Sequence, residues 1–498
     1  MRVTNGPDLP TASGPGATTT APPPPPDAPP PPEPAGLSRH EVLIGSSLAL
    51  GSFMVMIDTT VVSVATHALA VRFHASLSTV AWTSTAYLLT LSLVIPLSGW
   101  AMERFGGRRV WLAAVVAFCV GSILCGTAWS IGALIAMRVV QGIGGGLIAP
   151  VGQALIGRTI GPRQMAKVMA LLSVPMMLSP VLGPVLGGLV VDNLDWRWIF
   201  YLNLPFGLTA IALVLRNVPA QTPQRSQALD VRGLLLISPG LAALVYGCSE
   251  AGAAGGFGAP RVVGSIAAGI LLLIVFTVYS LRTKASPLMD LRLMRNRVVG
   301  AAMTNGLLLG VGLFGTMFLL PFYFQQARGA SALHTGLYLA PQGLGAALAS
   351  LVAGRVNERM GARALVFGGT LITTLATIPF LLLTADTSIG ALEAALVARG
   401  VGMGLVLASL FAAAYAPLER SAIPRAATLF NILNRVGGSL GTAVLAVALQ
   451  RGIADGDLSP SHLAHAYNTA FAWALGLSAL ALLPAVLLPG PARRATGR

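Results

Sequence analysis

The most informative chemical group in this 498-residue chain is a single carboxylate inside a long apolar stretch. Asp58 lies in the run from Val42 to Ala70, whose other residues are apolar or uncharged when His67 is taken as neutral. A charge at the centre of a bilayer costs about 2.5–3.5 kcal/mol on insertion scales. An acid that is costly to ionise can take up and release a proton near neutral pH. The pattern predicts a proton-binding site within a membrane protein; a structural acid held by a neighbouring helix is the alternative.

A cation inside another long apolar stretch is the second candidate. Arg138 lies where an arginine requires a partner or water, and its charge would act on an acid or a polar network across the interior. An arginine that binds backbone carbonyls and only fixes helix packing is the alternative. The glycine-rich stretch 142–146 follows within the same apolar run rather than after a soluble strand. This context favours close helix packing over phosphate binding.

Composition places both groups in a polytopic helical membrane protein. The chain is 54% hydrophobic and 10% charged, with a mean hydropathy of +0.75, whereas soluble domains carry about 25% charged residues. Several uncharged runs have the roughly 20 residues that cross a bilayer core, twice the length of a barrel strand. We therefore predict an all-α fold with 14 transmembrane helices, at 42–69, 79–101, 110–128, 131–157, 166–191, 198–215, 231–250, 262–281, 298–324, 333–354, 364–384, 389–411, 427–449 and 466–488.

The distribution of positive charge predicts the orientation of these helices. With the N-terminus inside, 24 of the 32 lysines and arginines fall on the inner side, 5 fall on the outer side and 3 lie within spans. Because cytoplasmic loops are enriched in Lys and Arg, we expect a multi-pass protein of the cell membrane with both termini in the cytoplasm. The net charge of +15 has the same explanation, and nucleic acid is not an expected partner because no basic stripe lies on an aqueous domain.

An internal repeat divides the chain into two similar halves. Residues 99–108 (GWAMERFGGR) recur 255 positions later as residues 354–363 (GRVNERMGAR), and Arg138 with its glycines recurs 261 positions later at Arg399. Two like halves are typical of a transporter with a site between them, and the long offset predicts an inserted helix pair. The predicted organisation is a disordered Pro-rich cytoplasmic tail (1–38), a six-helix half (39–216), two inserted helices with flanking loops (217–285), a second six-helix half (286–490) and a short basic cytoplasmic tail (491–498).

Five motifs follow one another in the first half. They are DTTVV at 58–62, GWAMERFGGRR at 99–109, RVVQGIGG at 138–145, GPVLGG at 183–188 and WRWIFYLNLP at 196–205. Together they resemble the major facilitator superfamily, in its fourteen-helix drug:proton antiporter branch, and the resemblance covers residues from about 42 to 488. It implies a fold of two six-helix halves plus two inserted helices that transports by alternating access.

The resemblance implies a role for several residues. Asp58 matches the acid implicated in proton and cation coupling, and Arg138 matches an arginine tied to proton transfer. The glycines and proline of the 183–188 motif match a pattern associated with antiporters rather than symporters, with generic kinking of the helix as the alternative. These antiporter-motif residues are Gly183, Pro184, Gly187 and Gly188.

The motif at 99–109 is expected to form a cytoplasmic gate. Glu103 would pair with arginines and cap a helix N-terminus, unless the arginines of this loop serve only to set the topology. The family usually has Asp at the position of Glu103, and usually Asn and Pro where Ser63 and His67 stand, so the gate and part of the transport path can differ here. The gate residues are Gly99, Glu103, Arg104, Gly106 and Arg108.

We therefore predict a proton-coupled antiporter that exports drugs, antibiotics or similar amphipathic small molecules. An exporter or proton symporter of a specific metabolite or lipid on the same fold is the alternative. Three second-half spans lack the central carboxylate that accompanies dications in this family, so monocationic, neutral or zwitterionic substrates are expected. No enzyme, catalytic residue or metal site is predicted. The expected partners are the substrate, protons and the lipid bilayer, and a monomer is the expected functional unit. No cofactor is expected beyond the proton motive force, because no Gly-Lys-Ser/Thr nucleotide-binding motif occurs in the sequence.

Overall fold

The computed structural model describes residue 1, residues 37–160 and most of residues 193–490, with gaps at 222, 224–227, 254–255, 284–286, 385–386 and 455–459. Between these stretches it describes residues 164, 167–169, 178–179, 182–183 and 185–190. No strand occurs in this part of the chain, and the predicted all-α membrane class is confirmed. Twelve of its helices are long and apolar enough to cross a membrane, or thirteen if one bent pair is a single span. Both predicted tails lie almost wholly outside the described residues, and half of the predicted span 166–191 does.

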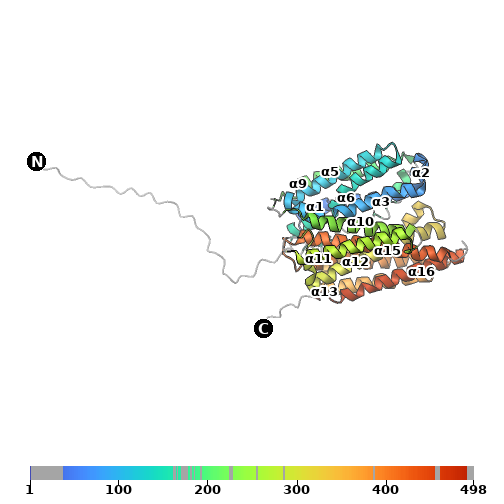
Figure 1. Ribbon diagram of the computed structural model, residues 1–498. Helices are drawn as coiled ribbons and strands as arrows, with labels where there is room; N and C mark the ends of the chain where they lie inside the picture. The colour runs from blue at the N-terminus through green and yellow to red at the C-terminus, as the bar shows by residue number, and fades with distance from the viewer. Residues whose placement is uncertain are drawn as a thin grey trace, which may run out of the picture. The chain divides into compact units, whose positions relative to one another are not determined.

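Helices of the first half run side by side in one bundle (Figure 1). At the start of α1, the Ser38 hydroxyl accepts from the Glu41 amide at 3.2 Å and the Glu41 carboxylate accepts from the Ser38 amide at 2.8 Å, which satisfies two donors of the first turn. Pro96 interrupts the predicted span 79–101, which is bent by 56° at that point. The helices are α1 (Arg39–Val64), α2 (Thr66–Phe73), α3 (Leu77–Val94), α4 (Leu97–Phe105), α5 (Gly107–Gly126), α6 (Ile131–Thr159), α8 (Trp198–Tyr201) and α9 (Asn203–Asn217).

The second half repeats this arrangement. Gly361 lies inside the long helix α13 with a φ of 78°, and Gly106, at the matching position of the repeat, has a φ of 86°. The sequence repeat is thus also a repeat of backbone conformation, since glycine alone adopts such angles without strain. The elements are η1 (Leu291–Arg295), α12 (Arg297–Phe322), the π-helix η2 (Tyr323–Ala327), α13 (Ala332–Leu375), η3 (Ile378–Leu381), α14 (Ile389–Tyr415), α15 (Ile423–Ala454), α16 (Pro460–Leu480) and α17 (Leu482–Ala485).

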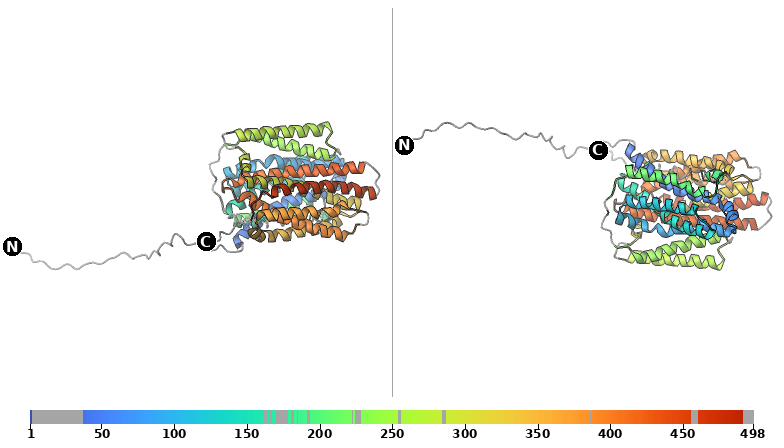
Figure 2. Two further views of the ribbon diagram at one scale, coloured as in Figure 1. Left: turned by 90° about the horizontal axis from the view of Figure 1, so that it is seen from below. Right: turned by 90° about the horizontal axis from the view of Figure 1, so that it is seen from above.

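Two further helices, α10 (Val231–Ala253) and α11 (Pro260–Arg282), lie at the edge of the bundle (Figure 2). Helix α10 packs against α3 of the first half and against α15 of the second. The Ser238 hydroxyl donates to the Leu93 carbonyl at 2.7 Å, and the rings of Trp82 and Tyr246 lie 5.9 Å apart. The pair therefore contacts both halves. The residue boundaries predicted for the domains stay a prediction.

Candidate functional site

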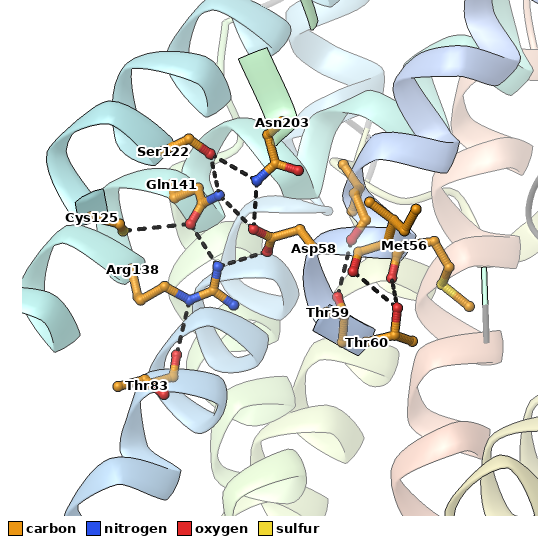
Figure 3. Close-up of polar contacts among 12 residues, drawn as sticks. Met56, Asp58, Thr59, Thr60, Thr83, Ser122, Cys125, Arg138, Gln141 and Asn203 are labelled. Carbon is orange, nitrogen blue, oxygen red and sulfur yellow. Dashed lines mark hydrogen bonds and ion pairs between the residues drawn. The ribbon is translucent and has the colours of Figure 1, made fainter. Parts of the chain in front are cut away.

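The two charged residues singled out from the sequence form an ion pair. Asp58 lies on α1 and Arg138 lies on α6, and Nη1 of Arg138 donates to Oδ2 of Asp58 at 2.6 Å (Figure 3). Both side chains are 0% exposed. Asp58 therefore does not face an open cavity in this conformation, and its carboxylate is enclosed within the first half.

Amide side chains complete the surroundings of the carboxylate. Oδ1 of Asp58 accepts from Nε2 of Gln141 at 2.9 Å and from Nδ2 of Asn203 at 2.8 Å. Both amides also donate to the Ser122 hydroxyl, at 2.7 and 3.0 Å. Four helices, α1, α5, α6 and α9, thus meet in one polar network (Figure 3). Each of these contacts places an N–H donor on a carboxylate oxygen, which accepts hydrogen bonds.

The arginine is held on its other sides as well. Its Nε donates to the Thr83 carbonyl of α3 at 3.2 Å, and its Nη1 also donates to Oε1 of Gln141 at 2.6 Å. The guanidinium lies 4.0 Å from the ring centroid of Tyr87 and 5.9 Å from that of Phe200. Stacking on an aromatic face stabilises a cation away from water. Nη2 has no hydrogen-bond partner in the described part of the chain.

The stability of this hydrogen-bond network depends on the charge of Asp58. Removing one partner of a buried ion pair costs about 3–5 kcal/mol, because the other charge is left in a low-dielectric interior. A proton on Asp58 would have this effect on Arg138. It would also place an O–H group opposite the donors of Gln141 or Asn203. One proton therefore changes the stability of the packing of four helices.

Two of the three described glycines of the antiporter motif, Gly183 and Gly187, lie against α1. A Cβ at Gly183 would overlap the Thr60 hydroxyl, and a Cβ at Gly187 would lie 3.2 Å from Cβ of Val64. A Cβ at Gly188 would meet no described atom within 4 Å. Gly183 and Gly187 thus permit close approach to the helix that carries Asp58. Pro184 lies outside the described residues.

Among the residues that the structure describes, three polar contacts join the two halves at one end of the bundle. Nη2 of Arg425 lies 3.1 Å from Oε2 of Glu103, and the two side chains are 26% and 14% exposed. The hydroxyls of Ser98 and Thr428 lie 2.7 Å apart. Both second-half residues belong to the first two turns of α15. The predicted gate residue Glu103 is therefore paired with an arginine of the opposite half at a helix N-terminus.

The third contact lies farther along the same helix. Nδ2 of Asn431 on α15 donates to Oε1 of Gln153 on α6 at 2.7 Å. Among the other predicted gate residues, Gly99 permits the approach of α15, because a Cβ there would lie 3.2 Å from the Thr428 hydroxyl. Arg108 donates to the Leu215 carbonyl at 2.7 Å, and Arg104 is exposed.

The second half contains a counterpart of the pair that lacks the acid. Arg399 on α14 is 0% exposed and its Nη2 donates to the Thr316 hydroxyl of α12 at 2.7 Å. Its Nε and Nη1 have no hydrogen-bond partner among the described residues. Thr316 thus stands on α12 where Asp58 stands on α1. The two halves share the buried arginine and differ in its charge compensation.

Comparison with known proteins assigns the family. The model of the Major Facilitator Superfamily matches residues 48–442. The chain belongs to this superfamily. As a major facilitator it is a multi-pass membrane transporter of small molecules and not an enzyme.

Individual relatives narrow this assignment. The "Multidrug resistance protein B homolog" of Mycobacterium tuberculosis (strain ATCC 25618 / H37Rv) is 41% identical over 402 residues, which cover 80% of this chain and 74% of the relative. The "Tetracenomycin C resistance and export protein" of Streptomyces glaucescens is 31% identical over 423 residues, covering 84% and 78%. The predicted membership in the multidrug-efflux branch of the superfamily is confirmed.

A solved structure supports the fold alone. The proton:xylose symporter XylE bound to 6-bromo-6-deoxy-D-glucose has a TM-score of 0.62 with 15% identity, over 89% of this chain and 94% of that one.

Asp58 and Arg138 stand out in the sequence by their charge, whereas the residues that complete their network do not. Gln141, Asn203 and Ser122 carried no charge and were not assigned a role. Their signal was present, since an amide three residues after Arg138 lies on the same helix face and Asn203 interrupts an apolar run. The functional roles of Asp58, Arg138, the antiporter motif and the gate stay predictions. In the described part of the chain, no group of three or more His, Cys, Asp or Glu side chains is placed to hold a metal ion.

Proposed function

We propose that this transporter is a proton-coupled antiporter that exports drugs, antibiotics or similar amphipathic molecules across the cytoplasmic membrane. The observation that carries the proposal is the enclosed ion pair of Asp58 and Arg138. It is a protonatable group whose charge is coupled to the packing of four helices. The multidrug and tetracenomycin relatives support export as the direction of transport.

Proton binding would act by weakening the network rather than by competing with substrate for the carboxylate. Asp58 is enclosed, so a substrate does not reach its oxygens in this conformation. A proton would remove the charge that Arg138 requires and would release the hold of Gln141 and Asn203 on α1. The free energy of proton binding is thereby available to favour a different arrangement of the first half.

Helix α6 connects the proton site to the contact between the halves. Arg138 lies near one end of α6, and Gln153, which binds Asn431 of the second half, lies 15 residues farther along. At 1.5 Å per residue this separation is about 22 Å. A shift of α6 caused by protonation of Asp58 would therefore also disturb its contact with α15. This is the physical link from proton to gate that antiport requires.

The positive charges support a cytoplasmic location for the end that holds Glu103 and Arg425. With both termini in the cytoplasm, the contacts of Ser98, Glu103 and Gln153 close the path on the cytoplasmic side. The described conformation then corresponds to the outward-facing state. Release of these contacts would open the site to cytoplasmic substrate.

The proton motive force supplies the energy, and no other cofactor is proposed. A potential of about 100 mV is equivalent to about 2.3 kcal/mol per charge. This suffices for roughly a 50-fold concentration gradient per proton. We propose that one chain is the functional unit, because both halves and the site between them come from a single sequence.

The test is drug transport into inverted membrane vesicles that contain the protein. With tetracenomycin C as the probe and an imposed inward-acid gradient, the wild type should accumulate the drug and collapse the gradient. Asp58→Asn should abolish both. Asp195→Asn, a loop acid that is 51% exposed, is the matched control and should behave like the wild type. Proton-driven accumulation by Asp58→Asn at the wild-type rate would overturn the assignment of the proton site.

A further inference from the structure

A cation on α15 is unpaired at the boundary between the two halves. The Arg435 side chain is partly buried, its Nη2 is buried without a hydrogen-bond partner, and no hydrogen bond or ion pair of this side chain occurs among the described residues. Arg399, deeper in the second half, also has unpaired donors. Two arginines of this half thus lie inside spans with no carboxylate bound to them in the part of the chain that is described. Burying an unpaired cation is costly, so a ligand that supplies an acceptor would be stabilised there.

Helical spacing places Arg435 on the face of α15 that contacts the first half. Thr428 and Asn431 on this face contact Ser98 and Gln153. Arg435 follows Asn431 by four residues, one turn farther along the same face. Its guanidinium is also close enough to Tyr87 of α3 to interact electrostatically with it. Arg435 therefore lies beyond the closed gate contacts, toward the proton site.

The charges around Arg435 disfavour permanent cations and favour ligands with hydrogen-bond-accepting oxygens. Asp58 is already bound to Arg138, so its negative charge does not compensate Arg435. A permanent cation would be repelled, whereas an oxygen with lone pairs would accept the free N–H groups. Charge-assisted hydrogen bonds of this kind are the stronger ones in proteins.

We propose that Arg435 binds a hydrogen-bond-accepting oxygen of the substrate, and that the transporter accepts uncharged or acidic oxygen-rich compounds in preference to permanent cations. This inference rests on the proposed function, because it assumes that the substrate passes along the boundary between the two halves. It changes the substrate range expected from the sequence by removing monocations and adding acidic compounds. It also agrees with an enclosed Asp58, because the substrate and the proton bind to different residues.

Two dyes with the same xanthene ring system test the charge preference directly. Fluorescein is acidic and rich in carbonyl and carboxylate oxygens, whereas rhodamine 123 is a permanent cation. Binding of each dye to the purified full-length protein in lipid nanodiscs is measured by fluorescence polarisation. The wild type should bind fluorescein more tightly than rhodamine 123. Arg435→Gln should weaken fluorescein binding by about 10- to 100-fold, the loss typical of a charged hydrogen bond.

Charge reversal provides a result that misfolding does not produce. Arg435→Glu should weaken fluorescein binding and strengthen rhodamine 123 binding, so that the preference inverts. Arg451→Gln removes an exposed cation from the far end of the same helix and should leave both affinities unchanged. This control separates a local contact from an effect of net charge.

The outcomes distinguish this inference from the proposed function. Equal fluorescein binding by the wild type and Arg435→Gln, or tighter binding of rhodamine 123 by the wild type, would overturn the role of Arg435. Neither result would affect drug-driven proton movement, which tests antiport separately. Conversely, fluorescein binding that depends on Arg435 without proton-coupled transport would support the site and overturn antiport.

Discussion

The ion pair between Asp58 and Arg138 leads to a quantitative prediction for a double-mutant cycle. Asp58→Asn leaves the guanidinium of Arg138 with the Thr83 carbonyl and the Gln141 amide oxygen, and it can place an amide N–H opposite other donors. Arg138→Gln leaves the carboxylate with the donors of Gln141 and Asn203. Each single change should cost about 3–5 kcal/mol of stability, the usual cost of isolating one buried charge.

The double variant should be more stable than the sum of the two single changes predicts. With both charges removed, neutral amides remain in the same polar cavity and neither charge is unpaired. We expect the two effects to be non-additive by about 2–3 kcal/mol, within the range for residues in one network. For a chain of 498 residues, 1 kcal/mol corresponds to about 1 °C in the unfolding midpoint. The single variants should therefore unfold about 3–5 °C below the wild type, and the double variant about 4–7 °C below it, rather than the roughly 6–10 °C that additive effects would give.

The assay is scanning fluorimetry of the four proteins in the same lipid nanodiscs at one pH. The exposed loop pair of Asp195 and Arg197 is the control cycle, and its interaction should be below about 1 kcal/mol. Additive midpoint shifts at the buried pair would refute the reasoning, because two charges that compensate each other cannot act independently. So would an Asp58→Asn protein that unfolds at the wild-type temperature.

Three further predictions concern the motif, the gate and the amide network. Gly183→Ala should reduce drug transport at least about 10-fold because the added Cβ overlaps Thr60, whereas Gly188→Ala should leave transport unchanged. Equal transport by the two variants in vesicles would contradict a functional need for the close approach of Gly183 to α1. In a protein with Ser98→Cys and Thr428→Cys, oxidation should cross-link the two halves. Adding Glu103→Gln should lower the cross-linked fraction, because losing a half-buried ion pair worth about 1 kcal/mol shifts the equilibrium between the closed and open gate by up to about fivefold. Arg104→Gln, at an exposed position of the same motif, is its control, and a drop of similar size there would attribute the effect to loop charge alone. Gln141→Leu should slow proton-driven transport about 10- to 100-fold by removing a donor to Asp58 and an acceptor from Arg138; wild-type transport rates would show that this amide has no part in coupling.

Much of the fold follows from the sequence because its physical signals are local. The length of each apolar run specifies a spanning helix, Pro96 specifies the bend between α3 and α4, and Gly106 and Gly361 specify two matching turns. The pairing of Asp58 with Arg138 was within reach for a related reason, since a buried charge requires a partner and few charges are available. These are properties of single residues in an apolar background.

The remaining features depend on contacts between helices distant in sequence. Nothing local in Glu103 identifies Arg425 as its partner, because the sequence predicts several other arginines on the same side of the membrane. Asn203 is one amide among many until α9 is packed against α1 and α5. The enclosure of the Asp58 carboxylate likewise results from the packing of four helices. Tertiary packing rather than residue type decides which polar groups join the network.

The most direct test of the account is proton release on substrate binding. Purified transporter in weak buffer is mixed with tetracenomycin C, and the released protons are measured with a pH indicator. The account predicts release from the wild type and from Asp195→Asn, and none from Asp58→Asn, because substrate binding favours the conformation in which Asp58 is ionised. Equal proton release from Asp58→Asn and the wild type would contradict the claim that Asp58 carries the coupled proton.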